Sequence, residues 1–240
     1  MDDVRYQACD TVSDLVARLV TDEDLSGTLA WLTEECARLP GVTASALLLV
    51  DRQGTLSVAA ASSAPVRRLQ EAELRVAEGP AHDSYDRGAR VDCLDAFDAD
   101  RRWPRFAPVA RRRGVQAVHA FPLPSPARTI GVLTMFMSEP GGLSDVALVA
   151  GQVLASTVAL GIESHQAAQL EIRTDQLQTA LDSRVLIEQA KGLLSERLGL
   201  SLDDAFTVMR RHARNNGERL VGVAAAVLDG TLTLPAHSPR

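Results

Sequence analysis

The segment that decides the fold of this chain is Val42-Thr43-Ala44-Ser45-Ala46-Leu47-Leu48-Leu49-Val50, and the turn Asp51-Arg52-Gln53-Gly54 follows it directly. A short apolar run with β-branched ends, bounded by a glycine-containing turn, is typical of a buried strand that enters a hairpin. We therefore expect a second strand over residues 55–61, paired with the first.

Outward from this hairpin, the same signals predict a sheet with helices beside it. The further strands are expected at residues 91–94, 115–122 and 129–137, and the helices at residues 1–21, 22–39, 66–77, 100–113 with a kink at Pro104, and a short one through Tyr85. Because tight turns join neighbouring strands, the fold class is expected to be α+β, with a mostly antiparallel sheet flanked by helices.

A long helix is expected after the sheet, because no helix breaker apart from two tolerated glycines occurs between Ser144 and Gly199. One face repeats at a spacing of three and four residues, as in a coiled coil. Its members are Val146, Val149, Val153, Ser156, Leu160, Glu163, Ala167, Leu170, Thr174, Leu177 and Leu181. Since residues 163–183 are polar elsewhere, we expect a coiled-coil linker that pairs two copies in a homodimer; an amphipathic helix folded back on the domain is the alternative.

A three-helix bundle is expected at the C-terminal end. Its first helix stops at Gly199, its second opens with a capping box at Ser201–Asp204 and ends at Asn215-Asn216-Gly217, and its third spans about 218–228. The residues expected to face its core are Leu202, Ala205, Phe206, Met209 and Ala213 of the second helix, and Leu220, Val223, Ala224 and Val227 of the third.

Composition limits the classes of function. The formal net charge of −6 argues against polyanion binding over the whole surface but allows a local basic patch. The three cysteines and five histidines are dispersed, so neither a disulfide framework nor a metal site is expected. Serine-hydrolase, metalloprotease, Walker A, Rossmann and receiver-domain patterns are absent, which predicts a protein that is not an enzyme.

The N-terminus and the longest apolar tract predict a cytoplasmic protein without a membrane partner. Met1–Arg5 lacks the basic start and apolar run of a signal peptide. Polar residues interrupt the apolar tract 146–162, which indicates a buried helix rather than a membrane span.

The bundle carries polar residues that its own core does not need. Arg184, Glu188 and Lys191 share one stripe with Gln189 beside it, and Arg210, Arg211 and Arg214 lie on the solvent side of the second helix. Lysine and arginine bind phosphates, and amide side chains read bases. Gly192 costs about 1 kcal/mol in mid-helix relative to alanine, which suggests a close approach to the backbone there.

The same residues fit a second interpretation. Cations are favoured in the last turns of a helix by the helix dipole, and residues 182–230 hold seven basic and seven acidic side chains. From the residues alone, a solvated face on a protein-interaction bundle stays open beside nucleic-acid binding.

The C-terminal region resembles the ANTAR domain. The residues that carry the resemblance are Arg184, Ile187-Glu188-Gln189-Ala190-Lys191-Gly192, Leu194, Glu196-Arg197, Gly199, Ser201, Asp204-Ala205-Phe206, Arg210-Arg211, Ala213-Arg214-Asn215-Asn216, Arg219-Leu220 and Val223-Ala224. ANTAR domains are RNA-binding transcription antiterminators that act as dimers on paired stem-loops in nascent leader RNA.

The resemblance implies an RNA-binding surface of Gln189, Ala190, Lys191, Gly192, Arg211, Ala213 and Arg214, to which we add the cations Arg184 and Arg210. The small residues among them would admit RNA close to the backbone, and Ser195 stands where the family commonly has methionine.

The upstream region resembles a GAF domain, as in actinobacterial proteins that join GAF to ANTAR. The residues that carry this resemblance are Glu78-Gly79-Pro80, Trp103-Pro104-Arg105-Phe106, Val118–Leu123 and Ile130–Leu133. It implies a binding pocket for a small molecule whose wall would include Tyr85, Trp103, Phe106, His119 and Phe121. The alternative is that these side chains fill the core, with His119 as a satisfied core residue.

Ala81 stands where relatives often have cysteine, and Cys93 is solitary, which argues against a covalently bound chromophore and leaves no resident cofactor expected. The arginines at 101–102 and 111–113 are interpreted as solvated surface, with an auxiliary RNA contact as the alternative.

Together these patterns predict a helical lead-in at 1–21, a GAF-like sensor at 22–162, a coiled-coil linker at 163–183, an ANTAR domain at 184–230 and a flexible tail at 231–240. The predicted function is dimeric transcription antitermination on tandem stem-loops in mRNA leaders. The rivals are a protein-interaction module, a ligand sensor whose C-terminal region has decayed, and a DNA-binding helix-turn-helix protein. Intact Lys191 and Arg214 oppose the decayed sensor, and Asp203 and Asp204 at the start of the second helix would repel DNA phosphates.

Overall fold

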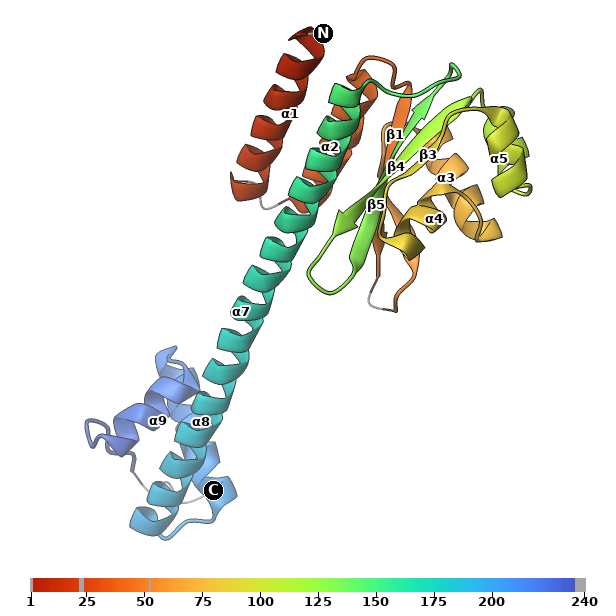
Figure 1. Ribbon diagram of the computed structural model, residues 1–240. Coiled ribbons are helices and arrows are strands. Elements are labelled where there is room, and N and C mark those ends of the chain that lie inside the picture. Colours follow the sequence, from red (N-terminus) through yellow and green to blue (C-terminus); the bar gives the residue numbers. More distant parts are fainter. Residues whose placement is uncertain (1, 22–23, 52, 236–240) are drawn as a thin grey trace. The chain divides into compact units, whose positions relative to one another are not determined.

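The computed structural model describes residues 2–21, 24–51 and 53–235 (Figure 1). The chain forms two compact units, Met1–Gln166 and Ala167–Arg240.

The first unit is built on a five-stranded sheet with the strand order β2-β1-β5-β4-β3, and all neighbours are antiparallel. The strands are β1 Ala44–Val50, β2 Leu56–Ala61, β3 Val91–Cys93, β4 Ala117–Pro124 and β5 Thr129–Met137. The predicted hairpins β1–β2 and β4–β5 are confirmed, and so is the antiparallel α+β fold.

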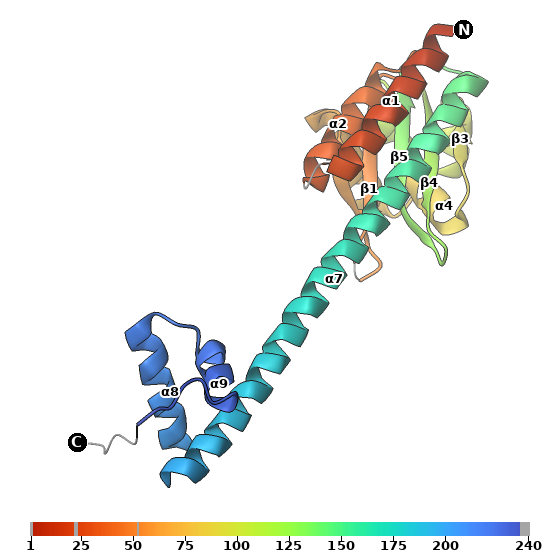
Figure 2. The same cartoon turned by 90° about the vertical axis from the view of Figure 1, so that its left-hand side faces the viewer.

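Helices cover both faces of this sheet (Figures 1 and 2). One face carries α1 (Asp2–Thr21), α2 (Leu25–Arg38) and the beginning of α7 (Asp145–Leu198), and the other carries α3 (Ala64–Val76), α4 (Pro80–Arg87), α5 (Ala96–Arg102) and α6 (Ala107–Arg111). Successive side chains of a strand point to opposite faces, so Leu47 and Leu48 lie in two different hydrophobic clusters, as do Phe121 and Ala120. The first unit therefore has two separate apolar cores, one on each side of the sheet.

The single kinked helix expected at 100–113 is two helices. α5 begins earlier than expected and ends at Arg102, and α6 starts at Ala107 after a turn that contains Pro104. One carboxylate oxygen of Glu78 accepts the backbone N–H groups of Arg105, at 2.6 Å, and of Phe106, at 3.2 Å. Because the Glu78 carboxylate accepts these two N–H groups of the turn, the chain changes direction between α5 and α6 and does not form one bent helix.

The first part of α7 approaches the sheet and α1 closely because two of its residues are glycines. A Cβ on Gly151 would lie 2.6 Å from the ring of Phe121, and a Cβ on Gly161 would lie 2.5 Å from Leu19 of α1. The core-facing residues of this part of α7 are Ala147, Leu154, Ala155, Val158, Ala159 and Ile162. The segment Asp145–Glu171 is long and apolar enough to cross a membrane. The core helix of a soluble protein passes the same test, and the packing of this helix in the core gives no indication of a membrane protein.

The second unit contains the last part of α7, α8 (Leu202–Asn216) and α9 (Leu220–Leu228). The expected caps are present: the Ser201 hydroxyl accepts the N–H of Asp204 at 3.1 Å, and Gly199 and Gly217 have φ of +64° and +67°. Ala205, Met209, Ala213, Val223, Ala224 and Val227 are buried together, as predicted for the faces of α8 and α9.

Two expectations for this unit are wrong. Leu202, the first residue of α8, is 51% exposed and does not belong to the core. The predicted flexible tail is packed as far as Leu234, which is buried in the bundle core. Residues 236–240 of that tail lie outside the described residues.

Candidate functional site

Three arginines on α8 surround an open hollow. Its volume is about 510 Å³, and we call it the α8 hollow; it is lined by Phe206, Thr207, Arg210, Arg211, Arg214 and Asn215. On a helix, residues three and four apart are neighbours, so two rows of side chains, 206-210-214 and 207-211-215, lie along one face. The sequence predicted the arginines of this site but not Phe206, Thr207 or Asn215, although the spacing of four from Arg211 indicates Thr207 and Asn215.

The arginines of the α8 hollow are free to bind a ligand. Arg210, Arg211 and Arg214 are exposed. Within residues 2–21, 24–51 and 53–235, none of them forms a salt bridge or a hydrogen bond. Three adjacent cations without partners attract an anion, and a chain of phosphates most strongly.

Lys191 of α7 joins this site but is already paired. Its ammonium lies 2.9 Å and 3.1 Å from the two carboxylate oxygens of Glu188, and it lies 5.7 Å from the centre of the Phe206 ring. Only 15% of the Lys191 side chain is exposed, against 56% of Glu188. An ion pair with such an exposed partner contributes at most about 1 kcal/mol, so an incoming phosphate can take Lys191 from Glu188.

The prediction of the RNA surface is wrong for two residues. Ala190 and Ala213 are buried in the bundle core, where they allow the helices to pack closely. They cannot touch a ligand in this structure, and we omit them from the surface.

The three remaining predicted residues, Arg184, Gln189 and Gly192, are exposed on α7. A Cβ added to Gly192 would have no atom within 4 Å. Among the described residues, no atom therefore occupies the space beside Gly192. The close approach to the Gly192 backbone that we expected is not made by another part of this chain.

The five residues of the predicted small-molecule pocket do not form one site. Phe121 lies in the cluster beneath α1, α2 and α7, whereas Trp103 and Phe106 lie in the cluster on the opposite face, with Tyr85 packed against it. The cavity beside Trp103 and Phe106 has a volume of about 20 Å³, which is room for about one water molecule. A ligand beside Trp103 and Phe106 would have to open the core.

His119 is a satisfied core residue. Its Nδ1 lies 2.7 Å from a carboxylate oxygen of Asp92, and its Nε2 accepts the backbone N–H of Leu143 at 3.0 Å. Since Nε2 accepts, the ring proton is assigned to Nδ1. The ring therefore connects the sheet edge to the loop before α7, and both nitrogens are engaged.

The motif Glu78-Gly79-Pro80 also has a structural role. Glu73 is fully buried beside it and accepts the N–H of Ala81 at 2.7 Å and the amide of Gln70 at 2.5 Å. A Cβ on Gly79 would collide with the Glu73 side chain, and Gly79 has a φ of +153° that favours glycine. Burial raises the pKa of Glu73 to about 7, although the hydrogen bond from Ala81 opposes this effect.

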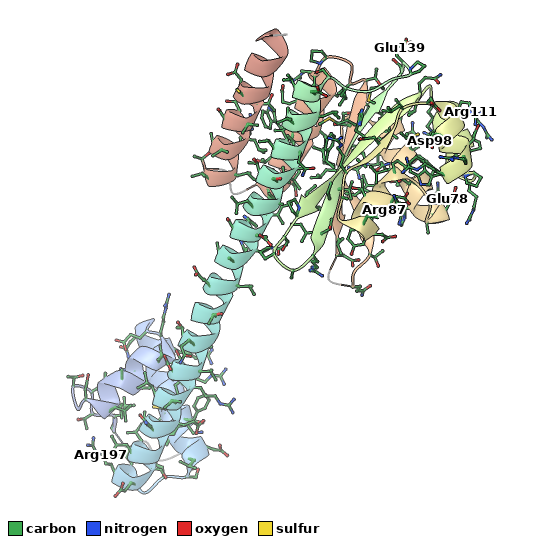
Figure 3. The ribbon with its side chains drawn as sticks, viewed as in Figure 1. Glu78, Arg87, Asp98, Arg111, Glu139 and Arg197 are labelled. Atoms are coloured by element: carbon green, nitrogen blue, oxygen red, sulfur yellow. The ribbon has the colours of Figure 1, made fainter. Side chains whose placement is uncertain are left out.

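Four of the five arginines at 101–102 and 111–113, all except Arg112, are engaged within the protein. Arg102 donates to the Asp92 carbonyl at 2.7 Å and to Asp98, Arg111 pairs with Asp100, and Arg113 donates to the Pro65 carbonyl at 3.0 Å. Figure 3 shows Glu78, Asp98 and Arg111 together on the layer of helices α3 to α6, which covers one face of the sheet. These arginines therefore stabilise the helix layer, in contrast to those of α8.

No group of three or more His, Cys, Asp and Glu side chains that could hold a metal ion occurs among the residues that the structure describes.

Comparisons with known proteins assign each region to a domain family. The GAF domain family model matches residues 22–163, and the ANTAR domain model matches residues 175–228. The comparison with curated proteins found no match.

Solved structures show the same fold for the first region. The chain is similar to the GAF domain of a phosphoenolpyruvate-protein phosphotransferase from Coxiella burnetii, at 14% identity and a TM-score of 0.57, over 69% of this chain and 98% of that one. It is similar to the corresponding Acinetobacter domain, at 16% identity and a TM-score of 0.52, over 66% and 94% of the two chains. It is also similar to the free methionine-R-sulfoxide reductase of Neisseria meningitidis, at 17% identity and a TM-score of 0.53, over 67% and 91%. At these identities the likeness shows the fold alone.

Proposed function

The chain belongs to the GAF domain family and carries an ANTAR domain behind it, and from this premise we propose that it is a dimeric, RNA-binding regulator of transcription antitermination. GAF and ANTAR domains are sensor and regulatory domains, so we propose no enzymatic activity, and we place the protein in the cytoplasm. The observation that carries the proposal is the α8 hollow, where three arginines without a partner among the described residues meet on a chain with a net charge of −6.

The ligand that fits this site best is an RNA hairpin. Its phosphates match the exposed guanidinium groups, and its loop presents unstacked bases that side chains can reach. A DNA-binding helix-turn-helix mode would place the first turn of α8 in the major groove. Asp203 and Asp204 occupy that turn and would repel phosphates, so we propose tandem stem-loops of mRNA leaders rather than duplex DNA.

A homodimer is supported by the exposed apolar residues of α7. They are members of the three-and-four repeat predicted for this helix, and we call them the α7 stripe: Val149, Val153, Leu160, Leu170 and Leu181. In the first unit, a groove of about 680 Å³ between α1 and α7 continues this stripe with Val12 and Val146. Side chains of this kind are removed from water when an identical helix packs against them, so we propose that two copies pair along α7.

Contacts within the first unit suggest how the sensor would control the helix. Gln152 of α7 donates to the Pro122 carbonyl of β4 at 3.4 Å, and Glu163 accepts a hydrogen bond from Ser125 in the β4–β5 turn. Because α7 is bonded to β4 and to the turn that follows β4, a signal that moves these segments would shift α7. We propose that this shift changes whether both ANTAR domains can bind paired stem-loops.

The test is binding of the full-length protein to an RNA with two hairpins and to the same RNA with one hairpin deleted. Linking two sites raises affinity by roughly 100-fold or more when the geometry allows both to bind. We expect that gain for the wild-type dimer. Leu160→Glu with Leu170→Glu should yield a monomer that keeps the single-hairpin affinity and loses the gain.

The control is Gln166→Glu, which adds a carboxylate at an exposed position outside the α7 stripe and should change neither mass nor affinity. Equal affinity of the wild type for the two RNAs, or a monomeric wild type in sedimentation, would contradict the dimer. Absence of RNA binding at low salt would favour the rival function, a protein-interaction module.

A further inference from the structure

The α8 hollow contains more than cations. An aromatic ring, Phe206, lines it at one end, and the Thr207 hydroxyl and the Asn215 amide line it as well. Phosphate binding requires cations and hydrogen-bond donors but no aromatic ring. The presence of Phe206 therefore calls for a ligand that also has a flat, apolar face.

Phe206 is placed as an accessible platform. Its α8 neighbours Ala205 and Met209 are fully buried, whereas Phe206 packs against the bundle core and keeps part of its surface exposed in the hollow. The Lys191 ammonium lies over the same ring, at 5.7 Å from its centre, and would have to move aside for a base to stack on that face. A ring held by the core on one side and bordered by cations is arranged for a planar, electron-rich group attached to phosphates.

The spacing along α8 fits a nucleotide. The rise of about 1.5 Å per residue puts Arg210 about 6 Å and Arg214 about 12 Å from Phe206 along the helix axis. Thr207 also lines the hollow, and its hydroxyl donates to the Asp203 carbonyl at 2.9 Å, so its oxygen can only accept a hydrogen bond from the edge of a base. Asn215 is nine residues from Phe206, about 13 Å along the axis, and is therefore available to a second nucleotide.

We propose that the α8 hollow receives one unpaired base of an RNA hairpin loop, stacked on Phe206, with Thr207 at the base edge and Arg210 and Arg214 on the adjoining phosphates. The inference rests on the proposed RNA-binding function and adds a base-stacking site to it. Loop bases that are unstacked in the hairpin stack on aromatic side chains in this way. Each such contact contributes about 1–3 kcal/mol, which is roughly 5- to 150-fold in affinity.

The experiment uses the full-length protein and a pool of hairpins with one fixed stem and a randomised loop. The tightest-binding hairpin is resynthesised with each loop nucleotide in turn made abasic, which removes the base and keeps the phosphate. We expect one abasic position to lose roughly 5- to 150-fold in affinity. Phe206→Leu, which keeps an apolar side chain against the core, should lose a similar factor on the intact hairpin and nothing further on that abasic hairpin, whereas Phe206→Trp should retain binding.

The control is Leu228→Val, a conservative change in a side chain that packs on the same core but does not line the hollow. It should leave both affinities unchanged. If Phe206→Leu weakens the intact and every abasic hairpin equally, or if no abasic position weakens the wild type, the stacking site is refuted while salt-dependent RNA binding stands. If the wild type binds no hairpin of the pool at low salt, the proposed function falls together with the inference.

Discussion

The interior of the GAF domain and the surface of α8 both carry conspicuous polar and aromatic residues, but the two regions use them in opposite ways. In the GAF domain, His119, Glu78 and Glu73 each bond groups of the same chain. On α8, Arg210 and Arg214 bond nothing in the described chain. The difference teaches that the residues carrying a family resemblance can maintain a fold in one domain and stay available for a ligand in the next.

The buried carboxyl of Glu73 should make the stability of the GAF domain depend strongly on pH. Burial raises the pKa of Glu73 from 4.5 to about 7. The folded state therefore holds this proton more tightly than the unfolded state does. The contribution of Glu73 to the free energy of unfolding is fully present below about pH 4.5 and is lost as the pH rises through about 7.

A pKa difference of this size corresponds to a loss of about 3 kcal/mol across that interval. Glu73→Gln keeps a neutral group in the same space, and its amide can bond Gln70 after that side chain turns over. We expect the variant to match the wild type near pH 4.5 and to be more stable at pH 8, as measured by urea denaturation at each pH. Parallel pH dependence in the two proteins would mean that Glu73 is not the buried, proton-holding group described above.

A smaller effect would test the second half of the comparison, the open surface beside α8. Gly192→Ala should stabilise the bundle by about 1 kcal/mol, because alanine favours the helix and its Cβ meets no atom of the chain within 4 Å. If RNA approaches the α7 backbone at this point, the same change should weaken RNA binding. The measurements are thermal unfolding and hairpin affinity on the same variant.

The matched control for this test is Gly222→Ala in α9, where a Cβ also has no atom within 4 Å. It should raise stability or leave it unchanged, without an effect on RNA binding. A Gly192→Ala protein that binds RNA as well as the wild type would show that the ligand does not reach α7 at this position.

Local signals in the sequence were enough to predict most of the architecture. The Asp51–Gly54 turn, the Ser201 cap and the glycines at 199 and 217 each act within a few residues, and the structure has the strands, the cap and the helix ends where these signals put them. The reversal between α5 and α6 was missed because the Glu78 carboxylate that bonds it is distant in sequence. For the same reason the burial of Leu234 was missed, since its contacts form only when the chain returns to the bundle.

The candidate sites show where sequence reasoning stops. Strand alternation puts His119 and Phe121 on one face of β4, but the position of Trp103 and Phe106 on the other face depends on how α5 and α6 fold back. Ala213 was expected both in the core and on the RNA surface. Its spacing of four from Met209 predicts the core, and the structure places it there.

We attribute RNA binding to the arginines of α8 and not to exposed arginines elsewhere in the protein. This attribution is tested most directly by the affinity of the full-length protein for a two-hairpin RNA over a range of salt concentrations. The double variant Arg210→Ala, Arg214→Ala should bind much more weakly, and its slope of log affinity against log salt should be smaller by roughly 1.5, about 0.7–0.9 for each lost phosphate contact. The charge-matched variant Arg68→Ala, Arg112→Ala removes two exposed arginines of the first unit and should keep the wild-type affinity and slope. Wild-type affinity and slope in the Arg210→Ala, Arg214→Ala protein, with its helix content unchanged, would contradict the account.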